Sequence, residues 1–119
     1  MDKGRIFLFH WNAEEAAYHA EQLREWGWRV ELEAEDGARG SKALIADPPN
    51  VILIYHTRLP SHGRATADYL AQHKATQDIP IVFVGGEYDA LQKTRAKLPG
   101  AIYVSENMLR PQLDELAFS

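Results

Sequence analysis

The stretch Val51-Ile52-Leu53-Ile54-Tyr55-His56-Thr57-Arg58-Leu59-Pro60 decides the fold, because five apolar residues run without interruption until polarity begins at His56. A continuous apolar run of this length, bounded by turn residues, is typical of a strand buried on both faces at the centre of a parallel sheet. In open α/β sheets, ligands and catalytic groups lie just beyond the carboxyl ends of the strands. His56 is therefore predicted to stand where such a protein would carry out its chemistry.

The composition excludes several classes of function. The chain has 119 residues, of which 45% are hydrophobic and 25% charged, and this suits one soluble domain spanning residues 1–119. A net charge of −4 argues against nonspecific nucleic-acid binding. The absence of cysteine from the sequence excludes a disulfide framework, a thiolate metal site and a cysteine nucleophile. Because there is neither a membrane-length apolar run nor a signal-peptide core, a cytoplasmic location is expected.

A second buried strand is predicted at residues 6–9, followed by a helix. Asn12 and Glu15 have the spacing of an N-cap and its N3 partner, and Gly27 ends the helical pattern. One helical stripe is predicted to face inward: Ala13, Ala16, Ala17, Ala20 and Leu23. Residues 29–34 then alternate, with Val30, Leu32 and Ala34 on one face and Arg29, Glu31 and Glu33 on the other. That period of two indicates an edge strand with one wet face.

The remaining pattern gives five strands that alternate with five helices. Later helices are expected at about 38–46, from a loop at 59–63 to about residue 73, at 89–98, and from near Pro111, with strands at 79–84 and 101–104. Such alternation predicts right-handed crossovers and a parallel sheet covered on both faces. With the polar second strand at an edge, the strand order is 2-1-3-4-5. Its switch point lies between strands 1 and 3, beside His10, Trp11 and His56.

Three segments are distinctive in their order and spacing. They are Val51 to Pro60, Ile79 to Val84, and Gly100-Ala101 before a short strand that contains Tyr103. This succession resembles the receiver domain of response regulators (CheY-like) over essentially the whole chain. The resemblance implies a flavodoxin-like, three-layer α/β sandwich with a five-stranded parallel sheet of order 2-1-3-4-5 and five helices. It also implies a role in bacterial-type, two-component signal transduction.

Receivers act by phosphorylation of an aspartate, and the resemblance places that chemistry on five positions. The acceptor position is His56, the magnesium-binding acid pair becomes His10 and Trp11, the hydroxyl position is Gly85, and the lysine position is Glu106. Magnesium needs oxygen ligands, which His10 and Trp11 do not supply. Gly85 has no hydroxyl, and Glu106 would repel a phosphate. The sequence therefore predicts a pseudo-receiver with a degenerate phosphoacceptor pocket, no enzymatic activity and no cofactor.

The histidines leave alternatives open. His10, His56 and His62 could form a metal- or small-ligand-binding crevice opposite Glu106, because imidazole and carboxylate suit Zn²⁺. The same group could instead sense pH, accept a phosphoryl group at His56, or simply cap strand ends. His19 and His73 fall on helices and are expected to face solvent. A flavin site is disfavoured, because the loop after the first strand is bulky and acidic.

Two aromatic residues near the pocket also have two interpretations each. Trp11 either plugs the space that metal and phosphate would occupy or is exposed to anchor a partner. Tyr103 stands where receivers carry a rotating aromatic residue. Without a hydroxyl at Gly85 it is expected to keep one rotamer, unless it is simply a half-buried strand residue.

A phosphorylation-independent interaction module is the function that the sequence favours. Receivers commonly bind partners, or one another, through the face made by their fourth helix, fifth strand and fifth helix. The corresponding residues are Leu91, Lys93, Arg95, Lys97, Tyr103, Met108 and Arg110. Because the charges on the fourth helix are mostly basic, a signalling protein with an acidic surface, or self-association, is expected. No nucleic-acid or membrane partner is expected.

Overall fold

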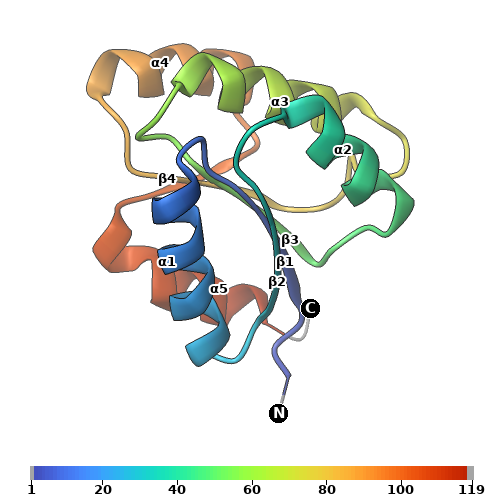
Figure 1. Ribbon diagram of the computed structural model, residues 1–119. Coiled ribbons are helices and arrows are strands. Elements are labelled where there is room, and N and C mark those ends of the chain that lie inside the picture. The colour runs from blue at the N-terminus through green and yellow to red at the C-terminus, as the bar shows by residue number, and fades with distance from the viewer. Residues whose placement is uncertain (1, 118–119) are drawn as a thin grey trace.

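A parallel sheet of five strands, in the order β2-β1-β3-β4-β5, runs through the computed structural model (Figure 1), which describes residues 2–117. The strands are β1 (Arg5–Phe9), β2 (Arg29–Glu33), β3 (Val51–Tyr55), β4 (Ile81–Val84) and β5 (Ile102–Val104). The helices are α1 (Ala13–Glu25), α2 (Gly37–Ala46), α3 (Pro60–Gln72), α4 (Tyr88–Lys97) and α5 (Leu109–Leu116), with a 3₁₀ turn, η1 (Glu106–Met108), before α5. The predicted α/β class, strand order and parallel pairing are confirmed.

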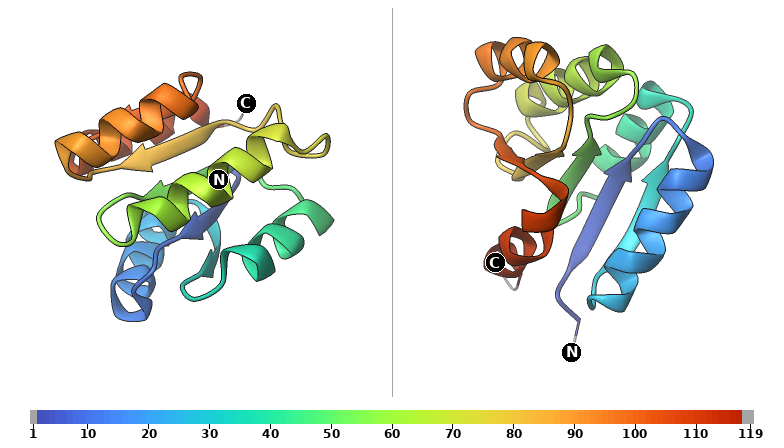
Figure 2. Two further views of the ribbon diagram at one scale, coloured as in Figure 1. Left: turned by 90° about the horizontal axis from the view of Figure 1, so that it is seen from above. Right: turned by 90° about the vertical axis from the view of Figure 1, so that its left-hand side faces the viewer.

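Two hydrophobic cores lie on opposite faces of the sheet. One is covered by α1 and α5, and alternate residues such as Leu8, Leu53 and Tyr55 point into it. The other includes Phe9 and Ile54 together with residues of α2 and α3. Successive side chains of a strand point to opposite faces, so this alternation continues into the residues that follow β1 and β3. The carboxyl ends of the strands all point the same way (Figure 2, right).

Helix α1 begins and ends where the sequence predicts. The side chain of Asn12 accepts a hydrogen bond from the Glu15 amide at 3.0 Å, and Gly27 takes a left-handed φ of 102° after the helix. Its inward stripe is narrower than predicted, because only Ala16, Ala20 and Leu23 are buried while Ala13 and Ala17 are exposed. A helix resting on a sheet buries only the residues whose side chains point straight at it.

The other boundaries shift by a few residues. The predicted loop at 59–63 is the first turn of α3, which starts at Pro60 because proline is tolerated at the first helical position. Helix α5 starts at Leu109, two residues before Pro111. In the part of the chain that the structure describes, no helix is both long and apolar enough to span a bilayer.

The edge position of β2 is confirmed, and Arg29, Val30 and Glu31 follow the predicted alternation, but the burial of the next two residues is the reverse of the prediction. Leu32 is 38% exposed, whereas Glu33 is only 9% exposed. The Glu33 carboxylate accepts hydrogen bonds from Arg39 Nε at 2.9 Å and Nη2 at 2.7 Å, and from the amides of Glu35 and Asp36 at 3.0 Å. These donors, with Arg39 foremost, lower the pKa of Glu33 to about 2. A buried acid is stable here because each oxygen is hydrogen-bonded.

Glu33→Ala is expected to lower the free energy of unfolding by roughly 1–3 kcal/mol at neutral pH, because it leaves Arg39 and two backbone amides without their acceptor. Urea denaturation measures the change, with the exposed Glu31→Ala on the same strand as control. Because the folded-state pKa is depressed, the contribution is complete above the ordinary pKa of 4.5 and is lost as pH falls through about 2. Equal costs for both variants would contradict this account.

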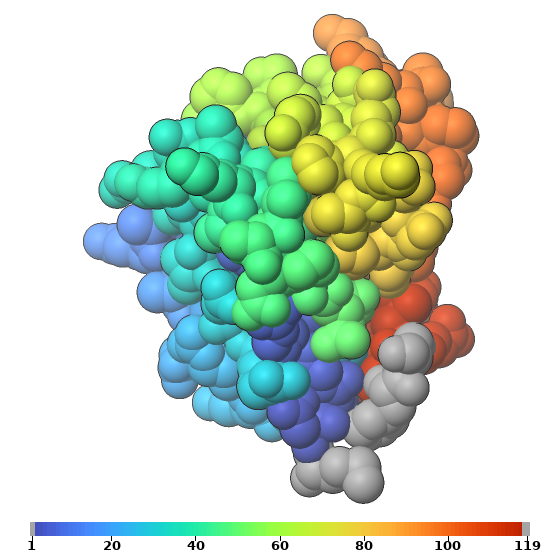
Figure 3. Space-filling model, turned by 90° about the vertical axis from the view of Figure 1, so that its right-hand side faces the viewer, coloured from blue at the N-terminus to red at the C-terminus, as the bar shows by residue number. Residues whose placement is uncertain are grey.

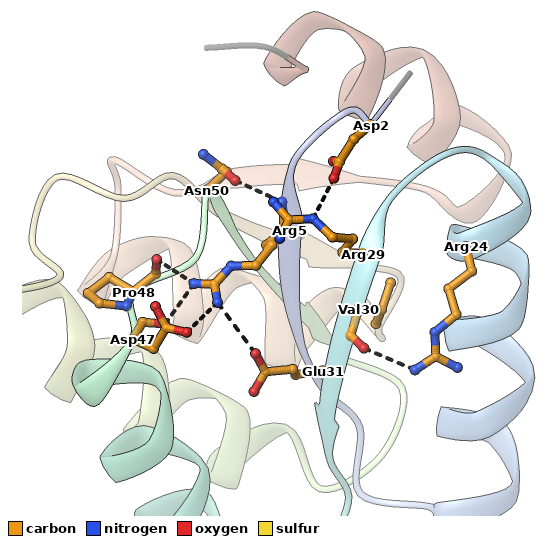
Figure 4. A network of polar contacts seen from close by, with 9 residues as sticks. All are labelled: Asp2, Arg5, Arg24, Arg29, Val30, Glu31, Asp47, Pro48 and Asn50. Carbon is orange, nitrogen blue, oxygen red and sulfur yellow. Dashed lines mark hydrogen bonds and ion pairs between the residues drawn. The ribbon is translucent and has the colours of Figure 1, made fainter.

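The end of the sheet away from His56 is fastened by Arg5 (Figure 4). Its Nη1 pairs with Asp47 Oδ2 at 2.6 Å, and its Nη2 donates to the carbonyls of Asp47 and Pro48 at 2.8 and 2.7 Å. The Arg5 amide also donates to Asn50 Oδ1 at 2.7 Å. These bonds hold the loop before β3 against the start of β1 (Figure 3, green beside dark blue).

Candidate functional site

The five predicted pocket residues come after β1, β3, β4 and β5, but the pleat puts the two histidines on opposite faces of the sheet. His10 comes after β1 on the α1–α5 side, where its ring lies 5.0 Å from that of Tyr55. His56 comes after β3 on the opposite side, where its ring lies 5.3 Å from that of Phe83. Glu106 is in η1 and approaches His19 of α1. The predicted single pocket is therefore two separate sites.

His56 is held in a buried polar network with α3 and α4. It is 2% exposed, and its Nε2 lies 2.7 Å from Thr94 Oγ1. The Thr94 hydroxyl donates to the Ala90 carbonyl at 3.0 Å and accepts from Arg64 Nε at 3.0 Å. Because that hydroxyl hydrogen is used on Ala90, His56 donates from Nε2. Burial, with a smaller effect of Arg64, lowers the pKa of His56, so its ring is neutral.

A cavity of about 530 Å³ lies beside His56. Its lining residues come from the loops after β3 and β4 and the start of α4: His56, Thr57, Pro60, Gly86, Glu87 and Ala90. A Cβ atom on Gly86, which has a φ of 106°, would stand 2.8 Å from His56 Nδ1, so this position requires glycine. Among the described residues that line the cavity, Glu87 carries the only full charge, which disfavours an anionic ligand.

On the other face, three aromatic rings form a ring stack: His10, Tyr55 and His19. The ring centroids of His19 and Tyr55 are 4.1 Å apart, and those of His10 and His19 are 5.4 Å apart. His10 is fully buried, and the His19 side chain is 11% exposed. The prediction that His19 faces solvent is therefore wrong. Spacing could have revealed it, because 16, 19, 20 and 23 is the buried-face pattern of a helix. His73 is half-buried, and its Nδ1 accepts from the Ala75 amide at 3.1 Å.

Trp11 packs between the starts of α2 and α3. Its ring stacks on Phe9 with centroids 6.0 Å apart and lies 5.9 Å from the ring of His62. It is half-buried and packs against the core on the α2–α3 face. The interpretation of Trp11 as a plug for the receiver's metal and phosphate space stays a prediction.

The alternative of a histidine metal site finds no support in the geometry. His10 and His56 are on opposite faces, and His62 is exposed in the first turn of α3. Within residues 2–117, no three His, Cys, Asp or Glu side chains are arranged to hold a metal ion.

The predicted partner face is brought together only in part. The Arg95 guanidinium lies over the Tyr103 ring, 5.0 Å from its centroid, and the Tyr103 hydroxyl donates to the Leu98 carbonyl at 2.8 Å. Lys97, by contrast, turns toward α3 and pairs with Asp68 at 3.5 Å. Arg110 lies 5.3 Å from the ring centroid of Trp26, at the end of α1. Leu91, Lys93, Arg95, Tyr103 and Met108 remain as candidates for one surface, which we call the α4–β5–η1 face.

The sheet order, the two helical layers and the loops at the carboxyl ends of the strands define the flavodoxin-like fold of CheY-like receiver domains. Solved receiver structures match it closely. The response-regulator receiver domain from Methylobacillus flagellatus superposes with a TM-score of 0.78 at 17% identity, covering 94% of this chain and 97% of that one. A putative response regulator from Chloroflexus aurantiacus gives 0.76 at 17% identity, covering 96% and 93%.

A third structure contains a metal ion. The receiver domain of a sensor histidine kinase from Pseudomonas aeruginosa superposes with a TM-score of 0.71 at 24% identity, covering 95% of this chain and 93% of that one. That structure holds a magnesium ion coordinated in its active-site cleft. No protein-family model and no curated protein matches the chain. The likeness therefore concerns the fold alone.

Proposed function

We propose that the chain is a receiver-like protein-interaction module of bacterial-type signal transduction that acts without phosphorylation and is not an enzyme. The observation that carries this proposal is His56 at the carboxyl end of β3. Its neutral ring is buried and its Nε2 is bound to Thr94 at 2.7 Å. The group at the acceptor position thus holds α4 against β3 and is not presented to an incoming phosphoryl donor.

The residues at the other positions that carry the receiver chemistry support the same conclusion. The P. aeruginosa receiver coordinates magnesium in its active-site cleft, and magnesium needs several oxygen ligands. Here the positions after β1 carry His10 and Trp11, which supply no carboxylate. Gly85 has no hydroxyl, and Glu106 brings a negative charge near His19. A phosphoryl group would meet neither a metal nor a cation at these positions.

Incubation with acetyl phosphate and Mg²⁺ is expected to leave the intact mass of the protein unchanged, because the His56 ring at the acceptor position is buried and its Nε2 is bound to Thr94. A receiver with the aspartate and acid pair, treated in parallel, shows that the reagent is active. His56→Ala locates any adduct. A stable phosphoryl adduct on the wild-type chain that disappears in His56→Ala would overturn the proposal.

The α4–β5–η1 face is the proposed contact surface for a partner or for self-association. Arg95 lies over the Tyr103 ring, and Met108, in the η1 turn that follows β5, is 54% exposed. Lys93 is exposed and makes no ion pair with any residue from 2 to 117. Arg95 beside the half-buried Tyr103 ring, and the exposed Lys93 elsewhere on the same helix, suit an acidic surface on the partner.

Reversing both charges, in Lys93→Glu with Arg95→Glu, is expected to weaken partner binding at least about tenfold, because like charges across an interface repel. The matched control is Lys42→Glu with Lys74→Glu, which makes the same change of charge at exposed positions away from this face. Binding is measured with the immobilised protein and extract from the source organism, and self-association by sedimentation. Equal binding by both double variants, or a monomeric wild type that retains no partner, would contradict the proposal.

A further inference from the structure

The ring stack of His10, Tyr55 and His19 joins three elements at the carboxyl end of the sheet. His10 follows β1, Tyr55 ends β3, and His19 lies on α1. Within the described chain, no hydrogen bond reaches His10 Nδ1 or Nε2, His19 Nδ1 or the Tyr55 hydroxyl, although all four atoms are buried. Buried polar groups are nearly always hydrogen-bonded, because leaving them unpaired costs stability. A concentration of such atoms around two titratable rings indicates a functional role.

The charges around the ring stack are arranged unequally. Glu15 Oε1 lies 3.4 Å from His10 Nε2, but the same carboxylate is bound by Arg58. Glu106 Oε1 lies 3.6 Å from His19 Nδ1, and the Glu106 side chain is 64% exposed. Tyr18 of α1 meets the His19 ring edge-on, 5.4 Å away. His10 therefore faces a carboxylate already paired with a cation, whereas His19 faces one that is available.

We propose that the ring stack is a proton-operated switch in which protonation of His19 draws Glu106, and η1 with it, toward α1. At 3.6 Å the neutral imidazole and the carboxylate are beyond normal hydrogen-bond length. An imidazolium donates to a carboxylate at about 2.7–2.9 Å, so one proton shortens this contact. The inference rests on the proposed function, because it supplies that module with an input other than phosphorylation.

His19 takes the first proton. Burial lowers the pKa of both histidines, but Glu106 and Glu15 oppose that effect at His19. At His10, both His19 and Arg58 add to the effect of burial, and only Glu15 opposes it. Because the two imidazoles are stacked, a charge on one repels a second charge on the other. The switch therefore carries one proton, and it operates on the acid side of the ordinary histidine pKa.

Movement of η1 reaches the proposed contact surface directly. The turn lies between β5 and α5, and Leu109 anchors its far end in the core at 1% exposure. Between these fixed points η1 carries Glu106 on the side of α1 and the exposed Met108. If the shift of Glu106 carries the backbone of η1 toward His19, as proposed, it changes how Met108 is presented on the α4–β5–η1 face.

The test is an NMR titration of the full chain from about pH 7.5 to about pH 5, following the imidazole resonances and the backbone amides of η1. In the wild type, His19 is expected to titrate below 6.5, and the η1 amides are expected to shift with the same midpoint. Glu106→Gln removes a group that raises the pKa of His19. It should lower the His19 midpoint further and abolish the η1 shift. His62→Gln, at an exposed histidine outside the ring stack, is the control and should change neither.

Comparing the wild type with Glu106→Gln tests the switch without a substitution in the core, because Glu106 is exposed. Constant η1 amides in the wild type, or a midpoint different from that of His19, would overturn the switch. So would a His19 midpoint that Glu106→Gln leaves unmoved. The titration needs no partner, so its failure leaves the proposed function standing. Conversely, a working switch in a protein that accepts a phosphoryl group or binds no partner contradicts the proposed function alone.

Discussion

Acidification from about pH 7 to about pH 5 is expected to destabilise the protein steeply, by up to about 1.4 kcal/mol per pH unit for each histidine that is buried neutral. Three histidines are of this kind: His10, His19 and His56. Burial lowers the pKa of each below 6.5. Since their folded-state pKa values are depressed, the unfolded chain binds more protons in this range. Their contribution is complete above the unfolded value and is lost as pH falls through the folded values.

Urea denaturation at a series of pH values and constant ionic strength measures this slope. His62→Gln, which changes an exposed histidine, should leave the slope unchanged, whereas His56→Gln should reduce it. Glu33 does not interfere, because its contribution is lost only as pH falls from 4.5 toward about 2. A free energy of unfolding that stays constant or rises between pH 7 and 5 would show that the three rings are not buried neutral.

The fold could be predicted from the sequence because its information is local and redundant. Residues 51–55 are all buried, and a strand covered on both faces needs an unbroken apolar run. The Asn12 cap and Gly27 fix α1 at both ends, and the charged residues of β2 place it at the edge. Each of these signals spans only a few residues, and all of them indicate the same fold.

The arrangement of the site could not be predicted as well, because it depends on the direction in which side chains of one element point relative to those of the next. His10 and His56 follow adjacent strands, and β1 pairs with β3 so that Phe9 lies beside Ile54. His10 and Tyr55 are therefore the next pair in this register, and their side chains share a face of the sheet. His56 is one residue further along and points to the opposite face. This follows from the pairing register, which composition and motif do not reveal.

The same dependence on distant partners explains Glu33 and His19. Alternation along β2 puts Glu33 on the polar face, but Arg39 and two amides make its burial possible. His19 fits the spacing of the inward stripe that the alanines and Leu23 mark on α1, and Tyr55 and His10 supply the contacts that bury it. In both cases a polar residue is buried because another element supplies its contact.

Thr94→Val is expected to lower the free energy of unfolding by roughly 1–3 kcal/mol, because it removes the acceptor shared by two buried or half-buried donors. Thr94 is fully buried, and its hydroxyl oxygen meets His56 Nε2 at 2.7 Å and Arg64 Nε at 3.0 Å. Valine has nearly the same shape, so packing is kept while the hydrogen bonds are lost. Arg64 can turn toward water, but His56, at 2% exposure, cannot.

Two further variants separate the hydrogen bond from packing. Thr94→Ser retains the hydroxyl and should cost clearly less than Thr94→Val, because the acceptor for His56 remains. In a His56→Leu background, Thr94→Val should cost less than it does alone, since removing both partners leaves no unpaired group. Urea denaturation at neutral pH gives all three values. If serine and valine cost the same, or the two substitutions are additive, the bond between His56 and Thr94 does not hold α4 against β3, and the acceptor position is free to serve another purpose.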